Sequence, residues 1–195
     1  GGAAAKLLLD LGYRHLTLCD KDGILVPGTP GQPSHHEELA ARTNPEKRTG
    51  TLAEALVGAD VFIGVSRPGL VTGAMVEAMS KDPVILAMAN PVPEIMPDEA
   101  LAHGAAVVGT GRSDFPNQIN NVLVFPGLFK GALSCGAVQI TEGMKYAAAQ
   151  ALADMVPPED LSPTCILPSP LNRAAADAVA NAVAAEARRT GHARF

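Results

Sequence analysis

Short apolar segments alternate with helical segments in the middle of the chain, and this alternation constrains the fold most strongly. Residues 61–66, 84–89 and 106–110 are nearly continuous runs of apolar residues and glycine. Residues 51–57, 71–80 and 98–103 lie beside or between these runs and have helical patterns. Strands that are apolar on both faces are typical of a parallel sheet with helices on both faces. The sequence therefore predicts a doubly wound α/β domain with a mainly parallel sheet.

The first residues resemble the start of a helix that follows a glycine motif. Gly1 and Gly2 precede small residues and an apolar helical run, and Gly12 stands at the position of a helix-ending glycine. Residues 15–20 form a short apolar segment, which we expect to be a strand, and a polar helix is expected at residues 35–42. No strand precedes the glycines in this sequence, so the first strand of the predicted sheet is missing from it.

The pattern changes after residue 118. Helices are expected at 119–134, with a break at Pro126 and Gly127, and at 141–155 and 172–189. We therefore predict a core at about residues 1–118 and a helical extension at about residues 119–195.

Charge and composition narrow the possible partners and compartments. A net charge of −5 argues against a nucleic-acid groove. No apolar run reaches the roughly 20 residues of a membrane span, and no secretory signal is visible. The three cysteines are widely spaced, so we expect buried or half-buried free thiols in a reducing, cytoplasmic compartment; they are Cys19, Cys135 and Cys165.

Gly, Pro, Asn and small hydroxyl residues follow the predicted strands. Ligands of open parallel sheets bind at the carboxyl ends of the strands, where such residues let the backbone approach closely. Asp20 lies about 20 residues after the glycines, at the spacing of an acid that binds the adenosine ribose of a dinucleotide. A strand-end acid that caps a turn is the alternative for Asp20. A turn is the alternative for Asn90, and helix capping is the alternative for Asn120 and Asn121.

Five segments, in order, resemble the C-terminal NAD(P)-binding domain of bacterial malic enzymes. They are residues 1–12, 18–23, 59–66, 89–95 and, most specifically, 109–123, which read Gly-Thr-Gly-Arg-Ser-Asp-Phe-Pro-Asn-Gln-Ile-Asn-Asn-Val-Leu. The resemblance covers essentially the whole chain and implies a Rossmann-like fold. It implies an oxidoreductase that converts malate to pyruvate and CO2 while it reduces NAD or NADP. The proteins of this family are usually oligomers, so a homo-oligomer is expected.

The resemblance also implies roles for individual residues. Gly1 resembles the third glycine of the phosphate loop, and Gly2 follows it at the helix that faces the pyrophosphate. Asp20, Ser66 and Asn90 are expected to bind the cofactor, with Asn90 near the nicotinamide. Asn120 or Asn121 is expected to meet the malate carboxylate.

The family's metal-binding acids and its catalytic Lys and Tyr lie N-terminal to the stretch with which this chain begins. We therefore expect Mg²⁺ or Mn²⁺ to bind outside these residues, no catalytic residue within them, and no turnover without the missing N-terminal domain. Lys130, Lys145 and Tyr146 have no pattern that places them at the groove, and the His35-His36 pair has no partner ligands.

Two other functions remain open from the sequence. One is a non-catalytic nucleotide-binding or regulatory module, and the other is the cofactor domain of a different two-domain dehydrogenase. The segment 109–123 argues against the second alternative. The basic residues at 188–194 resemble the point where some bacterial malic enzymes continue into a phosphotransacetylase-like domain.

Overall fold

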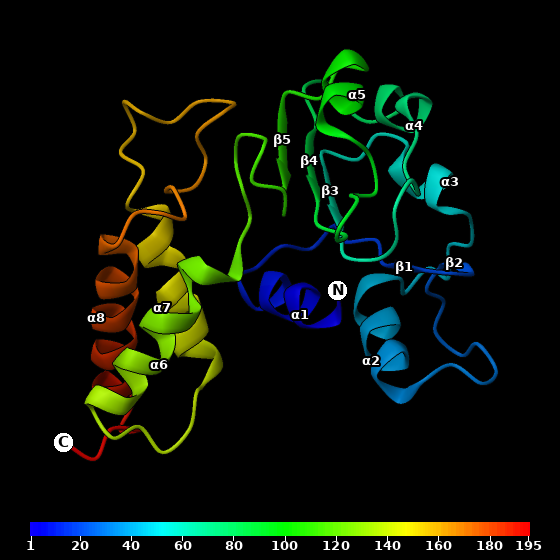
Figure 1. Ribbon diagram of the computed structural model, residues 1–195. Coiled ribbons are helices and arrows are strands. Elements are labelled where there is room, and N and C mark those ends of the chain that lie inside the picture. Colours follow the sequence, from blue (N-terminus) through cyan, green and yellow to red (C-terminus); the bar gives the residue numbers. More distant parts are fainter. The chain divides into compact units, whose positions relative to one another are not determined.

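A three-stranded sheet forms the centre of the α/β part of the molecule in the computed structural model, which describes residues 1–195 (Figure 1). The strands are β3 (Val61–Gly64), β4 (Val84–Ala87) and β5 (Val107–Thr110), in the order β3-β4-β5. β3 and β4 are parallel, with Val61 opposite Val84 and Gly64 opposite Ala87. The Rossmann-like α/β fold predicted from the alternating pattern is therefore confirmed.

Three short helices accompany the strands, one before each strand in the chain, and the sequence marks the start of each helix. They are α3 (Leu52–Leu56), α4 (Gly73–Glu77) and α5 (Pro97–Ala102). Thr51 and Thr72 cap α3 and α4 by accepting a hydrogen bond from a backbone N–H of the first turn. α5 begins with Pro97, whose missing N–H costs nothing at the first position of a helix.

The segment before the sheet differs from the prediction at residues 15–20. Only β1 (Cys19–Asp20) is a strand, and it pairs antiparallel with β2 (Gly23–Ile24) in a separate two-stranded sheet. The chain reverses at once because Asp20 Oδ1 accepts the Asp22 N–H at 2.8 Å and Gly23 has φ of 113°. The predicted strand was therefore wrong in its extent.

Two helices pack against each other in this first segment. α1 (Gly2–Asp10) and α2 (Ser34–Thr43) bury Ala5, Leu9 and Leu39 between them. Leu16 and Leu18 pack against this cluster, which explains the apolar residues of the predicted strand. The expected polar helix at 35–42 is confirmed.

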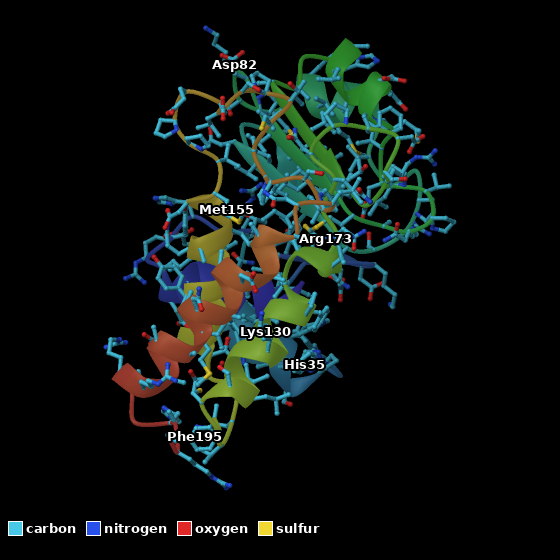
Figure 2. All side chains as sticks on the ribbon, turned by 60° about the vertical axis from the view of Figure 1, so that its left-hand side comes forward. His35, Asp82, Lys130, Met155, Arg173 and Phe195 are labelled. Atoms are coloured by element: carbon cyan, nitrogen blue, oxygen red, sulfur yellow. The ribbon has the colours of Figure 1, made fainter.

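The chain divides into two units, Gly1–Val107 and Val108–Phe195. The second unit contains a 3₁₀ helix η1 (Asn121–Leu123) and the helices α6 (Phe125–Ser134), α7 (Glu142–Ala153) and α8 (Ala174–Arg189). Met144, Val179 and Val183 are fully buried where α6 and α7 pack on α8. On the surface, Lys130 of α6 pairs with Asp177 of α8 at 2.6 Å, and Figure 2 labels Lys130 and Arg173 on this unit. The division predicted at about residue 118 stays a prediction.

Pro126 does not break a helix, contrary to the expectation for residues 119–134. It lies in the first turn of α6, where a proline fits without loss of a helical hydrogen bond. The residues before it form η1 instead of an earlier turn of the same helix.

The cysteine prediction is confirmed in its structural part, because all three thiols are free, Cys135 is buried and the other two are half-buried. None of the helices combines the length and the apolar character that crossing a membrane requires.

Candidate functional site

The loops after β3 and β4 are tied together by one buried carboxylate, that of Glu94. Its side chain is 0% exposed. Oε1 accepts the backbone N–H of Ser66 at 2.7 Å, and Oε2 accepts the backbone N–H of Ala89 at 3.0 Å. Ser66 follows β3, and Ala89 follows β4 and precedes Asn90. One side chain therefore fixes the carboxyl ends of two neighbouring parallel strands, which is the edge where ligands of such sheets bind.

The backbone of the same segment adds two more bonds to the loop after β3. The Glu94 carbonyl accepts the Val71 N–H at 3.0 Å, and the Pro93 carbonyl accepts the Gly69 N–H at 3.2 Å. Gly64 leaves the space for the carboxylate, because a Cβ atom at Gly64 would lie 2.5 Å from Glu94 Cδ. The two loops and the Glu94 segment are thus one hydrogen-bonded assembly.

Ser66 and Asn90, both predicted to bind a cofactor, are exposed at this edge. The Asn90–Pro91 peptide bond is cis. The backbone N–H of Ser66 donates to Glu94, so the hydroxyl is the polar group with which this exposed residue could bind a ligand. The Asn90 amide offers both donors and an acceptor without a charge.

The two N-terminal glycines lie at the start of α1, as predicted. Gly1 is the N-cap, and no side chain caps the helix, so its first backbone N–H groups are available to an anion. A Cβ at Gly1 would lie 3.6 Å from a methyl of Val65, which places the start of α1 beside the loop after β3. Gly2 has a packing role as well, since a Cβ there would lie 3.2 Å from Leu39.

Asp20 both caps a turn and keeps one oxygen free of hydrogen bonds. Oδ1 accepts the Asp22 N–H, and Oδ2 lies 3.8 Å from Nδ1 of His36, with the side chain 31% exposed. Burial and, to a smaller extent, the charge of Asp20 raise the pKa of the neighbouring Cys19 thiol, whereas Arg48 opposes the shift. Lys21 is held by Asp22, which raises the pKa of the lysine. Asp20 therefore does cap a turn, as the alternative interpretation expected, and its Oδ2 remains without a hydrogen bond.

The asparagines predicted to bind substrate lie in the second unit. Asn120 caps η1, because its Oδ1 accepts the Val122 N–H at 3.0 Å, and its amide NH2 group stays available. Asn121 is exposed in η1. Arg112, earlier in the same motif, forms a bidentate salt bridge with Asp114: Nε donates to Oδ1 at 2.9 Å and Nη2 donates to Oδ2 at 2.7 Å. This salt bridge raises the pKa of the arginine and lowers the pKa of the aspartate.

Sequence reasoning missed two buried polar residues. Glu94 belongs to one of the segments that carry the resemblance, and its position as an acid inside the apolar, proline-rich segment 91–97 is the signal that could have identified it. Asn117 is 7% exposed with φ of 53°, and its side chain joins the Val108 carbonyl, the Pro163 carbonyl and the Ile166 N–H. It joins the loop at 163–166 to Val108 of β5, within the second unit.

The residues of this chain do not form a metal site. No group of three or more His, Cys, Asp or Glu side chains is gathered in a way that could hold an ion. The donors present therefore do not fit the divalent metal that the resemblance implies for the intact enzyme.

Comparison with known proteins decides the family. Residues 7–188 match the family described as malic enzyme, NAD binding domain. The chain belongs to this malic enzyme domain family. Its relatives include a bifunctional malic/malolactic enzyme from Bacillus subtilis, 51% identical over all of this chain and 48% of that protein. An NAD-dependent malic enzyme from Geobacillus stearothermophilus is 46% identical over all of this chain and 40% of that protein.

Other relatives include an enzyme named as NADP-dependent and a protein with a solved structure. An NADP-dependent malic enzyme from Rhizobium meliloti is 43% identical over 99% of this chain and 28% of that protein. The crystal structure of an NAD-dependent malic enzyme from Thermotoga maritima is 42% identical, with a TM-score of 0.89 over 94% of this chain and 48% of that one. The malic enzyme domain described here thus spans about half or less of the length of these relatives.

Proposed function

We propose that this chain is the cofactor-binding part of a malic enzyme and binds NAD or NADP in its first unit. The match of residues 7–188 to the malic enzyme NAD-binding domain carries the proposal. The uncapped start of α1 at Gly1 and Gly2 offers backbone N–H groups to the pyrophosphate. Ser66 and Asn90 stand at the carboxyl ends of β3 and β4, where the nicotinamide end would bind.

Asp20 is proposed to bind the adenosine ribose through Oδ2, the oxygen that the turn leaves free. A carboxylate accepts hydrogen bonds from both ribose hydroxyls but repels a 2′-phosphate. Lys21 is paired with Asp22, so its charge is partly compensated. These contacts favour NAD over NADP for this chain.

For the whole protein we propose oxidative decarboxylation of malate to pyruvate and CO2. The dinucleotide, when bound, accepts a hydride from C2 of malate. Asn120 and Asn121 are proposed to orient the malate carboxylate, since an amide NH2 group donates to a carboxylate without adding charge. The Mg²⁺ or Mn²⁺ ion and the proton-transfer groups are proposed to come from a further N-terminal domain of a homo-oligomeric enzyme. The free thiols favour a reducing, cytoplasmic compartment.

Calorimetric titration of the chain with NAD and NADP tests the cofactor proposal. We expect the chain to bind NAD more tightly than NADP, and Asp20→Asn to weaken NAD binding about tenfold, the effect of losing one charge-assisted hydrogen bond. The same variant should reduce the preference for NAD, because it removes the charge that repels the 2′-phosphate. Asp82→Asn, at an exposed turn labelled in Figure 2, is the matched control. A folded wild-type chain that binds neither dinucleotide contradicts the proposal.

A further inference from the structure

The carboxylate of Glu94 is fully buried, yet it pairs with no cation. Its two oxygens accept the N–H groups of Ser66 and Ala89, at 2.7 and 3.0 Å. A buried carboxylate is costly unless it is hydrogen-bonded, and two backbone donors are the compensation that the structure provides. A residue with such a requirement is poorly suited to simple filling of space, for which an apolar side chain of similar size would serve.

The two donors belong to different loops, and this is the decisive observation. Ser66 lies after β3 and Ala89 lies after β4, and these strands are neighbours in the sheet (Figure 1). Asn90 is joined to Ala89 by one peptide bond, so the hydrogen bond to Ala89 also restricts the backbone that carries the Asn90 amide. The two hydrogen bonds to Glu94 thus hold together the two loops that carry Ser66 and Asn90.

The packing around the carboxylate leaves it little freedom. The backbone carbonyls of Pro93 and Glu94 hold the loop after β3 at Gly69 and Val71. The missing side chain of Gly64 provides the room for the carboxyl group, which a Cβ atom would meet at 2.5 Å. A rotation of the Glu94 side chain would therefore break both bonds to the loops.

We propose that Glu94 is a positioning residue for the nicotinamide end of the bound dinucleotide, acting through Ser66 and Asn90. This inference rests on the proposed function, because it assumes that these two loops receive the cofactor. Asp20 lies in the separate two-stranded sheet, so the adenosine end is bound by a different segment. The two ends of the cofactor can therefore be probed independently.

Glu94→Gln tests the proposal, because the amide keeps the size of the side chain but replaces one acceptor with a donor. That donor would face a backbone N–H, which breaks one of the two bonds. We expect calorimetry to show NAD binding about tenfold weaker, whereas the binding of AMP, which lacks the nicotinamide, changes less than twofold. Glu46→Gln makes the same chemical change at an exposed turn and should leave both affinities unchanged.

Each result separates this role from general damage to the fold. Equal loss of NAD and AMP binding would indicate a structural role only and would overturn the proposal. Equal NAD binding by wild type and Glu94→Gln would overturn it as well. If the wild-type chain binds neither ligand, the proposed function itself fails.

A measurement on the wild-type chain covers the case in which Glu94→Gln does not fold. We expect NAD to shift the amide NMR resonances of Ser66 and Ala89 and the side-chain amide resonance of Asn90, whereas AMP leaves them in place. Binding of NAD without a shift at these positions would overturn the role of Glu94, because the loops that it joins would not respond to the nicotinamide.

Discussion

A single side chain in this domain can cap a turn and still offer a free polar atom, and Asp20 is the clearest case. The sequence left open whether it caps a turn or binds a ribose, and the structure places one oxygen in the turn and leaves the other free of hydrogen bonds. Asn120 behaves in the same way, since its oxygen caps η1 and its NH2 group stays available. A capping role at the residue scale is therefore compatible with a binding role.

Glu54 provides a prediction about pH at this scale. It accepts hydrogen bonds from the Thr51 backbone N–H at 2.7 Å and from the Thr51 hydroxyl at 2.9 Å, and these bonds lower its pKa. A carboxylate whose pKa is lower in the folded state contributes stability above its unfolded pKa, and the contribution disappears as the pH falls through the folded pKa. Glu54→Gln removes this contribution.

We therefore expect Glu54→Gln to lower the free energy of unfolding at pH 7, and the difference from wild type to shrink at about pH 3. Urea unfolding at both pH values measures it. Glu46→Gln, at an exposed position, is the control and should follow wild type throughout. If the difference in the free energy of unfolding between wild type and Glu54→Gln stays constant down to the lower pH, ionisation of Glu54 does not contribute to stability.

The sequence predicted the role of a residue only when that residue contacts its near neighbours along the chain. Gly12 and the cap residue Asn120 act on their immediate neighbours, so local patterns identified their positions. Glu94 and Asn117 act on segments far away in the chain, up to 49 residues for Asn117 and Ile166. No local pattern encodes such contacts, because they depend on which loops the fold brings together.

At the scale of elements, most helices lie where their patterns predicted them, whereas the strand expected at 15–20 and the helix expected at 119–134 were wrong in their extent. Residues 15–20 have the composition of a buried strand, but their leucines pack against α1 and α2 and the chain turns back after Asp20. The periodicity of a short apolar segment does not tell which partner will bury it. Pro126 was similarly ambiguous, since a proline that ends one helix can equally begin another.

The packing of α6 on α8 depends on two glycines of α6, and this supports a prediction about stability. A Cβ at Gly131 would overlap the Ala180 carbonyl oxygen and lie 2.9 Å from Val183 Cβ. Gly127 is in the same situation, with the Ala176 carbonyl oxygen at 2.6 Å. Alanine normally stabilises a helix interior by about 1 kcal/mol relative to glycine. Here the overlap involves backbone atoms, which cannot move aside.

We expect Gly131→Ala to lower the free energy of unfolding by about 1–3 kcal/mol, the usual cost of overpacking. Gly143→Ala in α7 is the matched control, because its Cβ would meet only the side chain of Glu186, with Oε1 at 2.7 Å. That side chain can move at the expense of its surface pair with Arg189, which contributes little to stability. Gly143→Ala should be neutral or slightly stabilising. Denaturant unfolding followed by circular dichroism compares the variants. A Gly131→Ala protein as stable as wild type would contradict the close approach of α6 and α8.

For the molecule as a whole, the two units carry different parts of the proposed chemistry. The first contains the proposed cofactor contacts at Gly1, Asp20, Ser66 and Asn90, and the second contains Asn120 and Asn121. The spacing after the glycines already pointed to Asp20, whereas Asn90, Asn120 and Asn121 could be assigned only through the resemblance of their motifs, because turns and caps were equal alternatives for them. Neither unit gathers a set of metal ligands.

This distribution leads to a prediction about catalysis. We propose that the residues of this chain bind and orient the cofactor and the substrate, whereas the metal and the proton-transfer groups belong to a further domain. The relatives are more than twice as long as this chain, which leaves room for such a domain. We expect the isolated 195-residue chain to bind NAD but to form no pyruvate from malate, NAD and Mg²⁺ or Mn²⁺. A longer protein that contains this chain and such a domain should form it. Assays of pyruvate and of reduced nicotinamide measure the activity of both proteins. In the longer protein, we expect Asp20→Asn to raise KM for NAD about tenfold. Pyruvate formation by the isolated chain would show that its own residues complete the active site.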